Sequence, residues 1–174
     1  MEKKKIIRIA VTGPESTGKT TLAKELAKKY NTVWVPEIAR NYLTHINRPY
    51  EEKDLTEIAR RQRAEEEKLI SQANRIIFCD TEMLVIKIWS EFKYKRVSPY
   101  ILNELENQNY DAFLLCGTNL PWEYDVLREH PGMRESLYKI YFAELEQMNV
   151  PFLEVWGSVE ERIKLTETVL KKLL

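Results

Sequence analysis

The apolar positions of this chain form five short continuous runs, separated by longer segments in which apolar residues recur every three or four positions. The short runs are rich in β-branched and aromatic residues and are bounded by glycine, proline or polar residues. This pattern is typical of strands covered on both faces. Strands are therefore predicted at residues 6–12, 32–36, 75–80, 111–117 and 151–156.

The segments between these runs carry helical periodicity. Between residues 20 and 30, apolar side chains recur three and four positions apart, which places them on one helical face. The same reasoning predicts helices at 51–74, 136–148 and 158–174. Because predicted strands and helices alternate, we expect an α/β fold with a mainly parallel, five-stranded sheet. No linker or repeat divides the sequence, so residues 1–174 are expected to form one domain.

One segment interrupts this alternation. Residues 119–134, after the fourth predicted strand, are polar and aromatic and contain His130-Pro131-Gly132, which is typical of a hinge. We name residues 119–134 the lid segment, because a mobile insertion at this position is expected to close over a ligand.

The composition argues against some classes of binding partner. The 174 residues include 27 Lys and Arg and 27 Asp and Glu, so the formal net charge is zero, whereas nucleic-acid-binding domains usually carry positive charge in excess. No apolar stretch approaches the roughly 20 residues that cross a bilayer. Cys79 and Cys116 lie in apolar runs and are expected to be buried, reduced thiols. We expect a cytoplasmic protein with a small-molecule substrate and no nucleic-acid or membrane partner; its oligomeric state stays open.

The strongest chemical signal follows the first predicted strand. From residue 13 to residue 20 the chain reads GPESTGKT, which matches the phosphate-binding pattern G-x-x-x-x-G-K-[ST] between a strand and an amphipathic helix. Glycines let the backbone approach phosphate oxygens, and successive N–H groups form a positive cup. Lys19 is expected to reach the β- and γ-phosphates of ATP, and Thr20 to bind Mg²⁺. The predicted ATP-binding residues of this loop are Gly13, Glu15, Ser16, Thr17, Gly18, Lys19, Thr20 and Thr21.

Acidic residues stand at the ends of two other predicted strands. Glu37 follows the second strand, and Asp80 ends the third, with Glu82 two residues later. Because ligands bind at the carboxyl ends of parallel strands, Glu37 is a candidate general base, and Asp80 is a candidate Mg²⁺ ligand, partly through water. Glu82 is a further acidic candidate. The structural alternatives are that Glu37 caps the helix after it and that Asp80 caps a helix from Thr81 onward.

The lid segment carries arginines that suit a bound nucleotide. Arg128 and Arg134 are expected to close over ATP and to neutralise the transferring phosphoryl group. The alternative is a solvated helix with surface arginines. His130 is interpreted as a turn residue and His45 as a structural residue.

These features favour a small-molecule kinase over other proteins with a phosphate-binding loop. GTPases read guanine through an N-K-x-D motif, which residues 118–121 (TNLP) do not match. Motor and AAA-type ATPases are usually longer, with a strand that ends in Asp-Glu. A kinase needs a base, an acidic group near Mg²⁺ and an arginine, and Glu37, Asp80 and Arg128 could supply them.

Five stretches together resemble the ribosylnicotinamide kinase domain of bacterial NadR-type proteins: GPESTGKTTLA, VPEIARNYL, FCDTE, YDAFLLC and PWEYDVLR. The resemblance extends from about residue 6 to about residue 170. It implies a three-layer P-loop fold like that of nucleoside and nucleotide kinases. It also implies transfer of the ATP γ-phosphate to the 5′-hydroxyl of nicotinamide riboside, which gives nicotinamide mononucleotide for NAD salvage. Residues 13–20 carry over as the ATP loop, with Lys19, Glu37, Asp80 and Arg128 as the catalytic residues.

The substrate that the resemblance implies is a pyridinium cation, which aromatic faces attract. Besides Glu37 and Asp80, the predicted acceptor-site residues are Arg40, Tyr42 and Trp122. Trp34 also stands near a predicted strand end, whereas Trp89 and Trp156 are assigned to the core. Residues 157–159 are expected to contact adenine through the backbone.

The chain also departs from the NadR type. NadR-type proteins carry an adenylyltransferase domain before the kinase, and some add a DNA-binding helix-turn-helix. With two histidines and few residues before the first predicted strand, this chain is expected to have neither activity. The open alternatives are a kinase for another nucleoside or nucleotide, and a regulatory module that binds ATP without rapid transfer.

Overall fold

A single parallel sheet organises the molecule. The computed structural model describes residues 5–174, and its strands are β1 (Ile7–Thr12), β2 (Trp34–Val35), β3 (Ile76–Asp80), β4 (Ala112–Cys116) and β5 (Phe152–Val155). The strand order is β2-β3-β1-β4-β5, and every pairing is parallel. Each strand lies inside its predicted run, so the predicted five-stranded α/β fold is confirmed.

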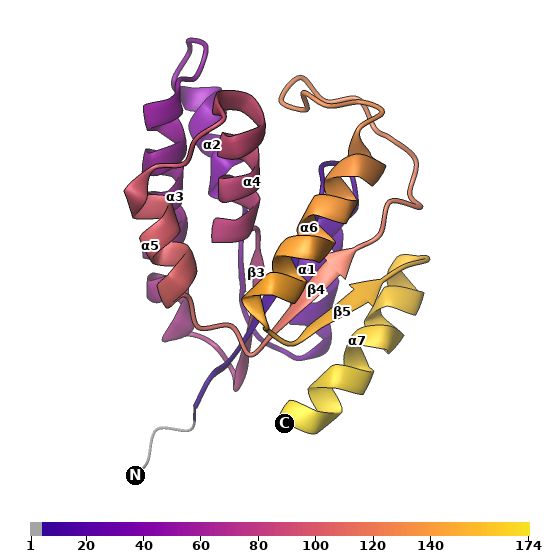
Figure 1. Cartoon of the computed structure of the whole chain (residues 1–174). Helices are drawn as coiled ribbons and strands as arrows, with labels where there is room; N and C mark the ends of the chain where they lie inside the picture. The colour runs from indigo at the N-terminus through magenta and orange to yellow at the C-terminus, as the bar shows by residue number, and fades with distance from the viewer. Residues whose placement is uncertain (1–4) are drawn as a thin grey trace.

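Helices cover both faces of this sheet. On one face, Ile9 and Val11 of β1 share a buried cluster with α1 (Lys19–Lys29) and α7 (Val159–Leu173). On the other face, Ala10 packs in a cluster with α4 (Met83–Tyr94) and α6 (Arg134–Met148). Figure 1 shows α6 in front of the sheet and α1 behind it. Alternate residues of β1 therefore serve opposite layers, as expected for a strand covered on both faces.

A group of helices between β2 and β4 extends the molecule to one side. It consists of α2 (Ile38–His45), α3 (Glu52–Ile70), α4 and α5 (Pro99–Asn107), which lie together in Figure 1. Of these helices, only α3 was predicted from the sequence. Helix α4 escaped it because its apolar residues do not form one stripe: Met83 and Ile86 pack among the helices, whereas Leu84 and Ile88 pack toward the sheet.

Differences at the element ends have local causes. Helix α3 ends four residues before the prediction, because the chain then turns into β3; there the Asn74 N–H donates to Thr32 Oγ1 over 2.9 Å. The lid segment forms no helix before α6 begins at Arg134. Cys79 and Cys116 are buried free thiols, as predicted. Within residues 5–174, no helix is both long enough and apolar enough to span a bilayer.

Candidate active site

The turn between β1 and α1 has the backbone shape that phosphate binding requires. Gly13 and Gly18 have φ angles of 132° and 80°, a region that favours glycine. A Cβ on Gly13 would lie 3.1 Å from the Cys116 carbonyl oxygen. Lys19 Nζ donates to the carbonyl oxygens of Gly13 (2.9 Å) and Pro14 (2.7 Å), so its ammonium group is folded over the loop.

Asp80 lies at the end of β3, beside the start of α1. Thr20 Oγ1 donates to Asp80 Oδ2 over 2.5 Å. The Asp80 side chain is buried, and its Oδ1 has no hydrogen-bond partner among residues 5–174. Burial raises the pKa of Asp80 to about 6, and the negative charge of Glu37 acts in the same direction. A hydroxyl beside a buried, half-satisfied carboxylate is a set of hard oxygen donors that fits Mg²⁺.

Glu82, rather than Asp80, caps the helix that follows β3. One Glu82 carboxylate oxygen accepts the Leu84 N–H over 2.7 Å, and the other accepts the Thr12 hydroxyl over 3.0 Å. Burial raises the pKa of Glu82 to about 7. Both oxygens are engaged, so Glu82 holds β1 and α4 together, and the capping alternative for Asp80 is not what the structure adopts.

Glu37 stands at the start of α2 but does not cap it. Its side chain makes no capping hydrogen bond. Instead Gln62, from α3, accepts the Ile38 N–H and donates to the Pro36 carbonyl oxygen, both over 3.0 Å. Because Gln62 satisfies the backbone at this helix end, the Glu37 carboxylate is left to face the cavity described next. Gln62 was not predicted, because nothing in the local sequence pattern around it pairs it with α2.

One cavity of about 340 Å³ joins the phosphate loop to the helices beyond it. Residues 13–21 form one wall, and α2, α4, α6 and the lid segment form the others. Among the predicted site residues, it brings together the phosphate loop, Glu37, Arg40 and Arg128. The side chains that the sequence analysis did not assign to a site include Leu43, Val85, Ile88, Trp89, Phe92, His130, Leu137 and Tyr141.

The aromatic residues of this cavity differ from those predicted. Trp89 was assigned to the core, yet it lines the cavity from α4, with Phe92 one helical turn further on. Trp89 Nε1 donates to the Tyr50 hydroxyl over 2.9 Å, which fixes the indole ring. The ring of His130 packs edge-on against Phe92, with 4.6 Å between the ring centroids. The i, i+3, i+4, i+7 spacing of Val85, Ile88, Trp89 and Phe92 could have indicated this face of α4, but the apolar residues on the other faces of the helix obscured it.

Three residues predicted to bind substrate are not among those lining the cavity: Asp80, which lies at the end of β3 beside Thr20, Tyr42 and Trp122. The Tyr42 hydroxyl donates to Asp54 Oδ1 over 2.7 Å, and Tyr42 is not among the residues lining the cavity. Trp122 does not line it either; the guanidinium of Arg134 lies 5.6 Å from its ring centroid. Trp34 packs against the α1 side of the sheet.

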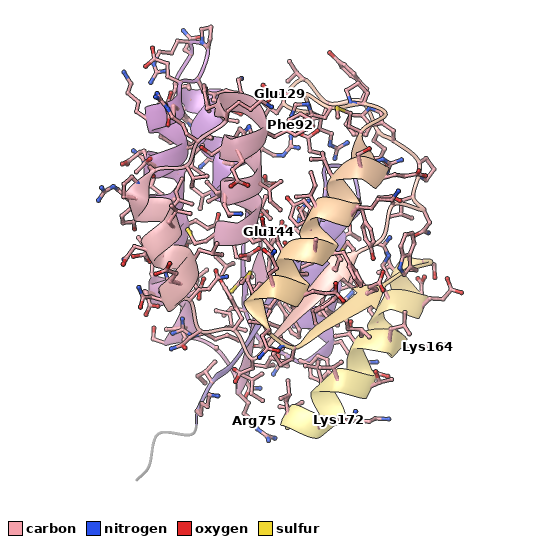
Figure 2. All side chains as sticks on the ribbon, in the orientation of Figure 1. Arg75, Phe92, Glu129, Glu144, Lys164 and Lys172 are labelled. Atoms are coloured by element: carbon pink, nitrogen blue, oxygen red, sulfur yellow. The ribbon has the colours of Figure 1, made fainter. Side chains whose placement is uncertain are left out.

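Side chains of the phosphate loop hold the lid segment by accepting hydrogen bonds from its backbone N–H groups. The Glu15 carboxylate accepts the N–H groups of Glu129 (3.4 Å) and His130 (3.3 Å), and Ser16 Oγ accepts the Glu123 N–H over 3.0 Å. Figure 2 shows Glu129 close to Phe92 at the end of the molecule where this segment passes. Glu15 and Ser16, predicted as ATP-binding residues, therefore also set the position of the lid segment.

Three arginines bind the lid segment or lie within it. Arg40 of α2 pairs with Asp125 over 2.7 Å. Arg134 donates to the carbonyl oxygens of Ser16 (2.9 Å) and Leu120 (2.7 Å), which joins the first residue of α6 to the phosphate loop. Arg128 donates to the Glu123 carbonyl oxygen and lines the cavity. Of the lid arginines, Arg128 is thus the one that faces the cavity.

Solved structures share this fold. A NadR protein in complex with NR matches 94% of this chain and 51% of its own, with a TM-score of 0.82 and 19% identity. A deoxyadenosine kinase from M. mycoides matches with a TM-score of 0.60 and 18% identity, covering 95% of this chain and 100% of its own. A thymidylate kinase from Candida albicans matches with a TM-score of 0.67 and 13% identity, covering 96% and 92%. The architecture is therefore that of P-loop kinases.

Curated relatives are found in two bacteria. The trifunctional NAD biosynthesis/regulator protein NadR of Escherichia coli (strain K12) is 26% identical over 153 residues, and so is that of Salmonella typhimurium (strain LT2). The match covers 84% of this chain and spans 37% of the length of each relative. The predicted resemblance to NadR-type proteins is confirmed.

A family model described as "AAA domain" (AAA_28) matches residues 8–162, from β1 to α7. Motor and AAA-type ATPases were set aside above as a class of activity, in favour of a small-molecule kinase; the description of the family model names a domain and no activity. The matched region contains the phosphate loop, Asp80, Glu37 and the lid segment. The chain therefore belongs to the AAA_28 family of P-loop domains.

Proposed function

We propose that this protein transfers the γ-phosphate of ATP to the 5′-hydroxyl of nicotinamide riboside, giving nicotinamide mononucleotide. One observation carries the proposal: a single cavity is lined by the phosphate loop, by Glu37, whose carboxylate makes no capping hydrogen bond, and by the aromatic residues Trp89 and Phe92. The relationship to NadR and the fold shared with a NadR protein bound to NR, here taken as nicotinamide riboside, support this choice of acceptor.

Each part of the cavity has a task in this reaction. Glu37 accepts the proton of the attacking hydroxyl, because its carboxylate has no capping bond to hold it elsewhere. Lys19 and Arg128 neutralise charge on the phosphates. Trp89 and Phe92 offer ring faces to the cationic pyridinium. Arg40, which lines the cavity beside Glu37, contributes to the acceptor side.

Thr20 and Asp80 would hold Mg²⁺. The free Asp80 Oδ1 and the adjacent Thr20 hydroxyl fit this ion, which commonly takes one or two protein carboxylates, waters and substrate phosphates. When bound, Mg²⁺ supplies charge neutralisation at the β- and γ-phosphate oxygens.

The test is ADP release measured across a panel of acceptors, with wild type and Glu37→Gln. Turnover with nicotinamide riboside is expected, with kcat reduced about 10²–10⁴-fold in the variant and little change in KM for ATP. Glu57→Gln is the matched control, because Glu57 is a half-buried residue of α3 that does not line the cavity and pairs only with Arg61 among residues 5–174. Its kcat should equal that of wild type. Equal kcat in Glu37→Gln would remove Glu37 as the base.

A second candidate is a kinase for another nucleoside, since the fold is also that of a deoxyadenosine kinase. Turnover confined to deoxyadenosine, thymidine, cytidine or uridine would replace nicotinamide riboside by that acceptor. ATP binding without turnover on any acceptor would replace both proposals by a regulatory module.

A further inference from the structure

Arg162 is a buried guanidinium behind the phosphate loop. It lies near the start of α7 and is 1% exposed. Its Nε donates to the Gly157 carbonyl oxygen over 3.1 Å, and its Nη2 donates to the Gly117 carbonyl oxygen over 3.1 Å. Its Nη1 donates to the Thr17 carbonyl oxygen. Asn119 Oδ1 also accepts from Nη2 over 3.1 Å.

This guanidinium has no carboxylate partner: none of the ion pairs formed within residues 5–174 includes Arg162. Burying a charge without a counter-ion costs free energy, and a cation near a helix N-terminus opposes the helix dipole. Fold stability alone therefore does not favour an arginine here. An anion bound in the adjoining loop would supply the missing negative charge.

The hydrogen bond to Thr17 has a consequence inside the loop. In a trans peptide unit, the carbonyl oxygen and the next N–H point in opposite directions. Arg162 holds the Thr17 carbonyl oxygen on its own side, so the Gly18 N–H is directed away from Arg162. Gly18 has a φ of 80°. Because a glycine can adopt many other backbone conformations as well, contacts from outside the loop are needed to hold it in this one.

The same guanidinium ties the loop to two further segments. Gly117 follows β4, and Gly157 begins the turn between β5 and α7, where the sequence analysis expected adenine contacts. Asn119 completes the connection, because its side chain accepts the Gly157 N–H over 3.2 Å and donates to the Gly157 carbonyl oxygen over 3.3 Å. The Arg162 side chain thus sets the position of the phosphate loop relative to the turn at residues 157–159.

We propose that Arg162 is a positioning residue for nucleotide binding: its fork fixes the Thr17–Gly18 peptide unit and the turn after β5, and its unpaired charge attracts the nucleotide phosphates. The inference rests on the proposed function only in taking ATP as the bound nucleotide. It requires the geometry of arginine as well as its charge, because the single nitrogen of a lysine cannot reproduce the donors that Nε, Nη1 and Nη2 spread over the planar guanidinium.

The test compares Arg162→Lys and Arg162→Gln with wild type, using titration calorimetry with ADP and Mg²⁺ together with steady-state kinetics. Both variants should bind ADP at least about 10-fold more weakly, with Gln worse than Lys. KM for ATP should rise by a similar factor, while KM for the acceptor changes less than about 2-fold. Arg63→Gln is the control, because Arg63 pairs with Glu66 and Glu104 on α3 and α5 and has no contact with the loop.

The control separates positioning from stability. Arg63→Gln should lower the Tm yet leave ADP affinity unchanged. ADP affinity equal to wild type in Arg162→Lys and Arg162→Gln would overturn the proposal, as would equal weakening in Arg63→Gln. If neither Arg162 variant folds, Asn119→Ala removes the side-chain acceptor instead and should weaken ADP binding about 3- to 10-fold; unchanged affinity would likewise overturn it. Because ADP binding needs no acceptor, a failure of the nicotinamide riboside proposal leaves this outcome readable.

Discussion

Asp54 and Asp80 are both buried aspartates, but their surroundings differ in kind. Asp54, on the first turn of α3, accepts two hydrogen bonds from Arg48 (2.8 Å each), one from the Tyr42 hydroxyl and one from the Glu51 N–H (2.7 Å each). The hydrogen bonds from Arg48 hold the pKa of Asp54 well below its usual range. In the described part of the chain, Asp80 has one hydrogen-bond partner, the Thr20 hydroxyl, and burial raises the pKa of Asp80.

The difference lies in partners rather than in burial. A carboxylate whose oxygens are all engaged stabilises the fold, whereas one with a free buried oxygen costs free energy until something binds it. Asp54 therefore supports α3, and the free oxygen of Asp80 is the reason that we propose Asp80 as a site residue. Substitution of Asp80 should therefore lower turnover without lowering stability, whereas substitution of Asp54 should lower stability without lowering turnover.

The largest effect is expected from Asp80→Asn. Asparagine keeps the shape but removes the charge, so turnover with ATP and Mg²⁺ should fall at least about 10³-fold. Because an ionised, half-satisfied group is removed from a buried position, the Tm at pH 8 should stay equal or rise. Coupled ADP release and calorimetric melting measure the two quantities. Normal turnover, or a large drop in Tm, would place Asp80 in the same class as Asp54.

Asp54→Asn should produce the reverse result. Loss of the Arg48 pair is expected to lower the free energy of unfolding by about 2–4 kcal/mol at pH 7, which is roughly 5–10 °C in Tm, with kcat at 25 °C unchanged. The folded-state pKa of Asp54 lies below its unfolded value, so this stability is present above about pH 4 and is lost as pH falls further. Melting curves from pH 7 to pH 3 should show the gap between wild type and variant narrowing only below about pH 4. A gap that is constant across this range would contradict the assignment.

The smallest effect is expected from Tyr42→Phe, which removes one hydrogen bond to Asp54. The expected loss is about 1–2 kcal/mol of stability, with KM for the acceptor within 2-fold of wild type. This variant also tests the sequence-based prediction that Tyr42 binds substrate. A large rise in acceptor KM without a change in Tm would restore that prediction.

The site was predictable from sequence where local order determines geometry. The phosphate loop is one continuous turn between a strand and a helix, and Asp80 ends a recognisable strand, so their places follow from the chain itself. Trp89 could not be assigned in this way. Its helix is apolar on more than one side, and only the packing of α4 between the sheet and its neighbouring helices decides which side chains border the cavity.

The hydrogen-bond partners of the site residues could not be predicted from the sequence for a related reason. The capping of α2 comes from Gln62, 24 positions away from Ile38, and the tie between Arg162 and Thr17 spans 145 positions. The sequence by itself determined the α/β alternation, the parallel sheet and the phosphate loop, because these depend on periodicity and on contiguous residues. Only the tertiary structure decided that Glu37 makes no capping hydrogen bond, that both oxygens of Asp54 are hydrogen-bonded, and that Asp80 Oδ1 has no partner within residues 5–174. These properties depend on which distant groups reach each carboxylate, and in a folded chain that is set by packing.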